Sequence, residues 1–310
     1  MFYYIGVDIG GTNIRIGVVS DEWEIIALYK FSTTKEPFET VVKHLEVIFD
    51  EYTISGLGIG VAGVVDKEGN VIVSPNIPSF NNFPLKKEIT KKFLVPTLVE
   101  NDANVATVAE ALFGEGRDAE SFILLTLGTG IGGGLWSSGK LSSFPIEVGH
   151  MSINYQGKSC TCGSNGCLEI YASAKAIKDG LIEKLEKGQE SYILQLYEGN
   201  FYKVVTEDIY RFALEGDPLC RGILKEAGKA LGAGVANLIN LFAPDKIILT
   251  GGLSKAEKIY IDTAKQEIKK RSLEGLFNKV KIVQSSLVDK GGVLGAVALL
   301  KSKSGVLCRK

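Results

Sequence analysis

The sequence lacks an excess of charge of either sign, because 35 Lys and Arg residues balance 36 Asp and Glu residues for a formal net charge of −1. Such a surface offers no electrostatic attraction to nucleic acid or to an anionic membrane, so we expect neither as a partner. The chain also lacks an apolar run of roughly 20 residues, the length that a membrane-spanning helix needs. No basic segment precedes the first strand-like stretch, as it would in a secretory signal peptide, and we therefore expect a cytoplasmic protein.

Of two common nucleotide-binding motifs, one is absent and the other lacks the helix that should follow it. The P-loop pattern GxxxxGK[ST] does not occur, which excludes a P-loop enzyme. The pattern GxGxxG occurs twice, beginning at Gly58 and at Gly128, but strand-like and turn-like residues follow each copy. A dinucleotide-binding fold needs a helix directly after this loop, so that its N-terminus meets the pyrophosphate. A dehydrogenase is therefore not expected.

At 310 residues the chain has room for two domains. Hydrophobic periodicity predicts strands at residues 3–9, 14–20, 24–32, 57–63, 71–73, 97–100, 122–127, 132–136, 246–250 and 280–284. It predicts helices at residues 37–52, 85–93, 103–113, 168–185, 206–215, 219–242, 255–271 and 292–301. Each half opens with a hairpin and continues with alternating strands and helices, which indicates a duplicated α/β fold. We expect a smaller lobe over 1–117, completed by the C-terminal helix at about 291–310, and a larger lobe over 118–290.

Three glycine-rich turns follow apolar strands. They are Gly10-Gly11-Thr12, Gly128-Thr129-Gly130 and Gly251-Gly252. A single glycine pair often does no more than close a tight hairpin. Glycine also lets backbone N–H groups approach a ligand without a Cβ in the way, which suits phosphate oxygens. The recurrence of such turns after strands favours a nucleotide site.

Two aspartates lie close to such turns or strand ends. Asp8 lies within an apolar strand, where an unpaired carboxylate is costly; besides a capping or turn role, it could hold Mg²⁺ through the water shell of the ion. Asp102, in the stretch ENDAN, lies at a strand-to-helix junction and could be a helix N-cap. It could also accept the proton of a substrate hydroxyl, since phosphoryl transfer needs only a weak, well-placed base.

The order of these motifs resembles that of the ROK family, which contains bacterial sugar kinases, notably glucokinases, and related repressors. The motifs are DIGGTNIR (8–15), ENDAN (100–104), LGTGIGGG (127–134), EVGH (147–150), CTCGSNGCLE (160–169) and LTGG (249–252). The resemblance spans residue 5 to about residue 300. It implies an α/β protein with the two-lobe actin-like ATPase fold (the ribonuclease H-like, sugar kinase fold), with ATP and Mg²⁺ in an interlobe cleft.

The resemblance also implies the roles of individual residues. Asp102 would be the general base on a sugar hydroxyl. The residues implied to bind the sugar are Asn76, Asn101, Asp102, Glu147, His150 and Glu169. Those implied to bind the nucleotide are Asp8, Gly10, Gly11, Thr12, Gly128, Thr129 and Gly130, with Gly251 and Gly252 near the adenosine.

An ATP-dependent hexose kinase is the function that follows from these roles, with glucose as the expected substrate and its 6-hydroxyl as the acceptor. The alternatives are a kinase for fructose, mannose or an N-acetylhexosamine, and a non-catalytic sugar-sensing regulator. The family's repressors carry an N-terminal helix-turn-helix; here the first strand begins at residue 3, so we expect no such domain. Family resemblance implies a homo-oligomer, either a dimer or a tetramer.

Two departures from the family pattern lie beside the residues implied to bind the sugar. Family glucokinases tend to carry Gly-Trp where this chain has Ser79-Phe80. The segment 139–147 is shorter than usual and lacks the customary Gly and Ala before Glu147. Both bear on which sugar is bound and leave the chemistry of transfer unchanged.

The chain has five cysteines, an odd number that favours reduced thiols over a disulfide framework. Cys160, Cys162 and Cys167 lie in one glycine-rich loop, shortly after His150. A redox site would show Cys-x-x-Cys opening a helix, and chance clustering is the other alternative. Three thiolates and one imidazole form the ligand set of a closed structural Zn²⁺ site. We expect this Zn²⁺ to orient Glu147 and Glu169 toward the sugar, with His150 offering one ring nitrogen to the metal and the other to a sugar hydroxyl.

Overall fold

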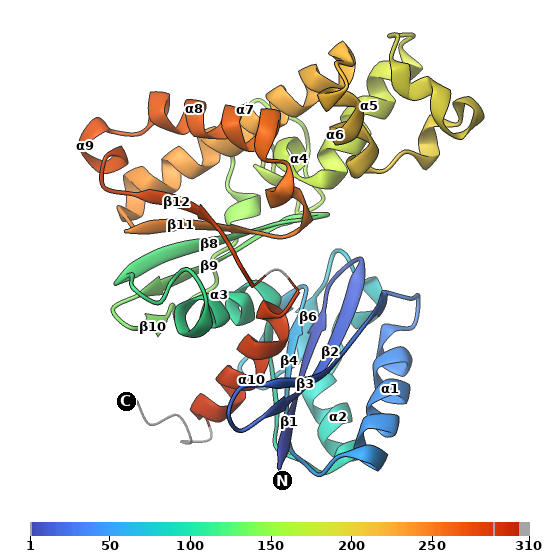
Figure 1. The fold of residues 1–310 in the computed structure, drawn as a ribbon, viewed down its shortest axis with the longest axis vertical. Helices are drawn as coiled ribbons and strands as arrows, with labels where there is room; N and C mark the ends of the chain where they lie inside the picture. The colour runs from blue at the N-terminus through green and yellow to red at the C-terminus, as the bar shows by residue number, and fades with distance from the viewer. Residues whose placement is uncertain (1, 288, 304–310) are drawn as a thin grey trace. The chain divides into compact units, whose positions relative to one another are not determined.

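The computed structural model describes residues 2–287 and 289–303, which form two compact units of mixed α/β structure (Figure 1). Unit 1 consists of the described residues within 1–120, 134–143 and 285–310; unit 2 consists of 121–133 and of the residues from 144 to 284. The lobe boundaries expected from the sequence, 1–117 with 291–310 and 118–290, stay a prediction. Residues 304–310 of the expected C-terminal segment lie outside the described residues.

Unit 1 is built around a sheet of mixed direction. In spatial order its strands are β3 (Ile25–Ser32), β2 (Asn13–Ser20), β1 (Tyr3–Ile9), β4 (Ile54–Val61) and β7 (Thr97–Asn101). The first three strands pair antiparallel, whereas β1, β4 and β7 pair parallel. A small two-stranded sheet, β5 (Val64–Val65) and β6 (Val71–Val73), follows β4.

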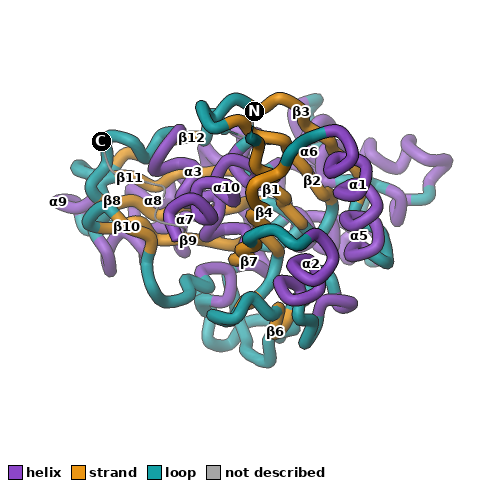
Figure 2. Tube along the Cα trace, turned by 90° about the horizontal axis from the view of Figure 1, so that it is seen from below, coloured by secondary structure: helices purple, strands orange, loops and turns teal. Residues whose placement is uncertain are grey.

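Helices cover both faces of this sheet. They are α1 (Pro37–Glu51), α2 (Leu85–Phe93), α3 (Asp102–Phe113) and α10 (Gly291–Lys303). Side chains of α1 and α2 join one buried cluster with Ile5, Val7 and Ile9 of β1. Side chains of α3 and α10 join another, and Figure 2 shows these two helices on the opposite side of β1 and β4 from α1 and α2. Alternate β1 residues therefore face opposite layers, as a strand buried on both faces requires.

Glycines in the strands let α10 lie directly against the sheet. A Cβ added to Gly6 would lie 2.2 Å from the carbonyl oxygen of Val293, and one added to Gly58 would lie 2.1 Å from that of Ala296. Real side chains cannot approach the backbone so closely, so any larger residue would push the helix away. The glycine-rich pattern of β4 thus serves helix packing.

We expect Gly58→Ala to destabilise the protein by about 1–3 kcal/mol, because the obstacle is the backbone of α10 and cannot rotate aside. Gly180→Ala is a matched control, since no atom lies within 4 Å of a Cβ at that position in α5 (Ala174–Glu186). Alanine there should stabilise the helix by up to about 1 kcal/mol. Thermal unfolding should show opposite shifts of Tm; a Gly58→Ala protein as stable as the wild type would contradict the close packing of α10.

The second sheet, most of which lies in unit 2, runs in the order β10 (Lys140–Leu141), β9 (Ile131–Ser137), β8 (Ser121–Leu127), β11 (Lys246–Thr250) and β12 (Lys281–Gln284). The helices of unit 2 are α4 (Glu169–Ala172), α5, α6 (Thr206–Leu214), α7 (Pro218–Phe242), α8 (Asp262–Arg271) and α9 (Glu274–Phe277). The long α7 contacts each of the other five. No helix among the described residues combines the length and apolar character that crossing a membrane requires.

Two helices expected from the sequence are interrupted in the structure. The stretch 168–185 is not one helix, because Ser173 is extended (φ −75°, ψ 165°) and its side chain caps α5 by accepting the Ala176 N–H. The stretch 255–271 becomes regular only at Asp262, after an irregular turn in which Ile259 has φ 72°. That turn places Tyr260 in the core, where its hydroxyl donates to the carbonyl of Ala172 at 2.7 Å.

Candidate functional site

In unit 1, the predicted site residues gather at one edge of the sheet. Ile9 of β1 pairs with Val61 of β4, which pairs with Asn101 of β7, so the three parallel strands end side by side. The turn Gly10-Gly11-Thr12 and the pair Asn101-Asp102 therefore lie at the same edge. Ligand sites of parallel α/β sheets form at such carboxyl ends.

The turn after β1 is held by its own backbone and by Thr33. The Gly10 N–H donates to the Asn13 carbonyl at 2.9 Å, and the Thr33 hydroxyl donates to the Gly10 carbonyl at 2.7 Å. A Cβ on Gly11 would lie 2.9 Å from the Cβ of Asn76, so the turn and the loop carrying Asn76 are in contact. The structure thus brings an implied phosphate-binding residue and an implied sugar-binding residue together.

Asp8 forms an ion pair that the sequence analysis missed. Its Oδ2 lies 3.2 Å from Nη1 of Arg15, and Nη2 of Arg15 lies 2.9 Å from Oδ1 of Asp289. A Cβ on Gly292, in the first turn of α10, would lie 2.7 Å from the same Oδ2. Burial raises the pKa of Asp8, and the Arg15 guanidinium opposes that shift. Asp8 is therefore held by an ion pair and by close packing against α10. The ion pair could have been predicted from the hairpin register, which sets Asp8 opposite Arg15.

The alternative that Asp102 is the N-cap of α3 is wrong, because Asn101 is the cap. The Asn101 Oδ1 accepts the N–H groups of Ala103 and Asn104 at 2.9 and 3.1 Å, and its Nδ2 donates to the Gly63 carbonyl at 2.9 Å. Asp102 is the first residue of the helix, half-buried, with its Oδ1 2.9 Å from the Ala103 nitrogen. An acidic side chain in the first turn of a helix interacts favourably with the helix dipole.

In unit 2, two more of the predicted turns meet. Strands β8 and β11 are parallel and pair up to Thr126 and Thr250, so the turns that follow them lie at one edge. Gly251 has φ +89°, and a Cβ there would lie 2.4 Å from the Leu127 carbonyl oxygen. Glycine is therefore required both for the backbone conformation and for the close approach of the two turns.

The turn Gly128-Thr129-Gly130, followed by Ile131, is anchored at both ends by one segment. The carbonyl of Gly128 accepts the N–H of Ala174 at 2.9 Å. The N–H of Ile131 donates to Oε2 of Glu169 at 2.8 Å. Glu169, implied by resemblance to bind the sugar, thus contacts an implied phosphate-binding turn. No sequence signal marks a bond of this kind.

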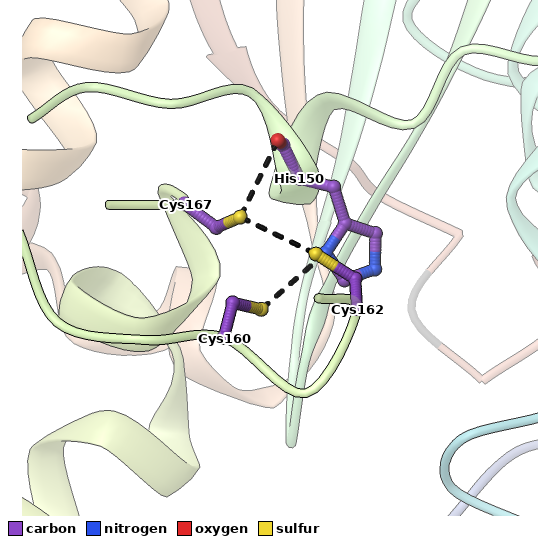
Figure 3. Close-up of side chains that lie close together, drawn as sticks. All are labelled: His150, Cys160, Cys162 and Cys167. Carbon is purple, nitrogen blue, oxygen red and sulfur yellow. Dashed lines mark hydrogen bonds between the residues drawn. The ribbon is translucent and has the colours of Figure 1, made fainter. Parts of the chain in front are cut away.

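His150, Cys160, Cys162 and Cys167 converge on one point (Figure 3). One ligand atom from each residue lies within 4.8 Å of every other, with Cys162 Sγ 3.6 Å from Cys167 Sγ and Cys160 Sγ 3.8 Å from His150 Nδ1. Thiolates around a tetrahedral Zn²⁺, with Zn–S bonds near 2.3 Å, are about 3.8 Å apart. The donor set and its spacing therefore fit zinc.

Two glycines set the conformation of the cysteine loop, and a backbone hydrogen bond and burial shift the pKa values of its thiols. Gly163 and Gly166 have φ +90° and +72°, and a Cβ on Gly166 would overlap the Asn154 carbonyl at 1.7 Å. The Ser164 backbone N–H lowers the pKa of Cys162, whereas burial raises the pKa of Cys167 to about 12. A coordinated divalent cation would hold both as thiolates.

The loop that carries Cys160, Cys162 and Cys167 also brings together the chain segments of Glu147, His150 and Glu169, the implied sugar-binding residues of unit 2. Glu147 precedes a helical turn, Val148–His150, in which the His150 N–H donates to the Glu147 carbonyl at 3.0 Å. The Leu168 N–H donates to the Met151 carbonyl at 2.9 Å, which joins the chain after His150 to the chain before Glu169. Because Nδ1 of His150 faces Cys160, its Nε2 remains for another partner.

Comparisons with known proteins identify this two-lobe α/β architecture. The chain is 34% identical to the glucokinase of Thermotoga maritima over 97% of this chain and 98% of that protein. It is 33% identical to the xylose repressor of Caldicellulosiruptor bescii over 96% of this chain and 78% of that protein. The crystal structure of a ROK family glucokinase from Streptomyces griseus in complex with glucose and AMPPNP is similar, with a TM-score of 0.85, 32% identity and coverage of 97% and 99% of the two chains.

The class is thus that of the sugar kinases with the actin-like α/β fold, as the sequence predicted. The family model described as "ROK family" matches residues 4–303, and the chain belongs to the ROK family.

Proposed function

We propose that the protein is an ATP-dependent hexose kinase that transfers the γ-phosphoryl group of ATP to the 6-hydroxyl of glucose. The observation that carries the proposal is the common strand edge that holds Asp102 and the turn after β1, with Asp8 one position before the end of that strand. The glucokinase of Thermotoga maritima and the glucose–AMPPNP complex of the Streptomyces griseus enzyme support it.

In the proposed reaction Asp102 accepts the proton of the 6-hydroxyl as its oxygen attacks the γ-phosphorus and ADP leaves. The transition state is loose, so orientation of the hydroxyl by a weak base is sufficient. Backbone N–H groups of the glycine turns at 10–12 and 128–130, other than those of Gly10 and Gly128 that donate within their own turns, would donate to phosphate oxygens. Asp8 would hold Mg²⁺ through its water shell, and the ion neutralises phosphate charge when bound.

We propose that the sugar's remaining hydroxyls are bound by Asn76, Asn101, Glu147, His150 and Glu169. Asn101 keeps one amide N–H for this purpose, because its oxygen and its other N–H are used by the cap and by Gly63. His150 would donate or accept through Nε2, and Glu169 through Oε1. Gly251 and Gly252 would lie against the adenosine.

We also propose one structural Zn²⁺ per chain, held by His150, Cys160, Cys162 and Cys167. Four protein ligands leave no coordination position for a catalytic water. The metal would therefore orient the residues that contact the sugar. The cytoplasmic location and the dimeric or tetrameric state implied by the resemblance stay predictions.

A coupled assay of ADP release across a panel of sugars tests the proposal. With ATP and Mg²⁺ we expect glucose to give the highest kcat/KM among glucose, fructose, mannose and N-acetylglucosamine. A higher kcat/KM with another sugar would support the kinase activity and replace glucose as the proposed substrate. The Ser79-Phe80 departure from the family pattern would then be the first candidate cause of the changed specificity.

A sugar-sensing regulator is the second candidate, favoured by the similarity to the xylose repressor of Caldicellulosiruptor bescii. The two candidates differ in one observable property. A regulator would bind sugar in a calorimetric titration and would release no ADP with any sugar of the panel. A kinase would both bind its sugar and release ADP.

A further inference from the structure

We propose that Glu169 is a positioning residue for the nucleotide, which couples sugar binding to the phosphate-binding turn at 128–131. The inference rests on the proposed function and extends it. One carboxylate oxygen would contact the sugar while the other holds the turn, so that each substrate raises the affinity for the other.

The contact that carries the inference is the bond from the Ile131 N–H to Oε2 of Glu169, at 2.8 Å. Ile131 is 4% exposed, so its N–H has little access to water as an alternative partner. A hydrogen bond to a carboxylate is stronger than one between neutral groups, and its loss leaves the donor unsatisfied. Glu169 therefore fixes the end of the turn that follows Gly130.

The other end of the turn is held by the same segment of chain. Ala174, the first residue of α5, donates its N–H to the Gly128 carbonyl at 2.9 Å. Between these two anchors, Gly128 donates its N–H to the Gly130 carbonyl at 3.0 Å, which leaves Thr129 exposed at the tip. A displacement of the segment from Glu169 to Ala174 would thus move the turn as a unit.

That segment is in turn fixed by the cysteine loop and by α7. Leu168 is fully buried against Gly234 of α7 and donates its N–H to Met151 at 2.9 Å. Cys167 precedes it directly. These contacts hold the backbone next to Glu169, and a sugar hydroxyl on Oε1 would restrict the Glu169 side chain to the conformation that holds Ile131. Coupling of this kind is reciprocal between the two ligands.

The test is calorimetric titration with AMPPNP–Mg²⁺, in the presence and absence of glucose, on four proteins. Without sugar, we expect Glu169→Ala to weaken AMPPNP binding about 10-fold or more. Glu169→Gln should bind within about 3-fold of the wild type, because its amide oxygen can still accept the Ile131 N–H. Glu226→Ala is the control; it removes an exposed carboxylate of α7 that pairs with Lys184 at the surface, and it should bind AMPPNP like the wild type. Glucose should tighten AMPPNP binding about 5-fold or more in the wild type and not in Glu169→Ala.

Wild-type AMPPNP affinity in Glu169→Ala, or an equal loss of affinity in Glu226→Ala, would overturn the inference. If the wild type phosphorylates glucose while Glu169→Ala binds AMPPNP normally, the proposed coupling is refuted and the proposed kinase function stands. If the wild type neither binds AMPPNP nor releases ADP, the proposed function itself is refuted. Should Glu169→Ala not fold, hydrogen exchange on the wild type decides. Amides of the peptide spanning 127–135 should exchange more slowly with glucose alone, and an unchanged rate would overturn the coupling.

Discussion

Asp102→Asn is expected to lower kcat for glucose phosphorylation by about 10²- to 10⁴-fold, the usual contribution of a positioned general base. The amide has nearly the same shape, so the Kd for glucose should change little. Asn101, which caps α3, is untouched, and the helix should form as in the wild type. Steady-state kinetics together with calorimetric glucose binding measure the two effects separately.

Asp66→Asn provides the matched control, because it makes the same chemical change in unit 1 at a turn before β6. There the Asp66 carboxylate accepts the N–H and side-chain amide of Asn70, both at 2.8 Å, and these bonds lower its pKa. We expect wild-type kcat from this variant. An Asp102→Asn enzyme with near-wild-type turnover would remove Asp102 from the role of base.

Cys162→Ser is expected to lose the bound zinc and to raise the KM for glucose about 10-fold or more. A serine hydroxyl does not deprotonate to replace the thiolate, and three remaining ligands bind the metal more weakly. Cys162 is exposed, so the substitution leaves the core intact. The loop would lose the point on which His150 and the three cysteines converge, and with it the fixed orientation of Glu147 and Glu169.

Ser164→Ala, in the same loop, should keep both the zinc and the wild-type KM, because Ser164 contributes only backbone bonds to Cys160 and Cys162. Elemental analysis and glucose kinetics on both variants make the comparison. Full activity in a metal-free preparation of the wild type would refute the structural role of zinc.

The regular parts of the fold could be predicted because their patterns are local. Residues Tyr3–Ile9, Leu85–Phe93 and Lys246–Thr250 have the bounds that hydrophobic periodicity predicts. The turn before α8 could not be predicted, because its backbone conformation depends on the burial of Tyr260 and on its hydrogen bond to the distant Ala172 carbonyl. Long-range packing overrode the local helical pattern there.

The candidate site also has parts that could be predicted from the sequence and parts that could not. Rare residue types made the cysteine and histidine cluster visible in the sequence, and the structure brings those four side chains together. Asn and Asp both cap helices well, so the sequence alone could not show whether Asn101 or Asp102 is the cap of α3. The structure decides this by showing the residue at which β7 ends and α3 begins. The bond from Ile131 to Glu169 involves a backbone N–H, which every residue type other than proline carries and no motif can reveal.

The most direct test of the proposed kinase activity is the ³¹P NMR spectrum of wild-type protein incubated with glucose, ATP and Mg²⁺. We expect the γ-phosphate signal of ATP to be replaced by ADP and by one phosphomonoester whose phosphorus couples to the two protons on C6 of the sugar. The same mixture with Asp102→Asn should remain almost unchanged over that time. An unchanged ATP spectrum with the wild type, or a phosphate on the anomeric oxygen, would contradict the proposal.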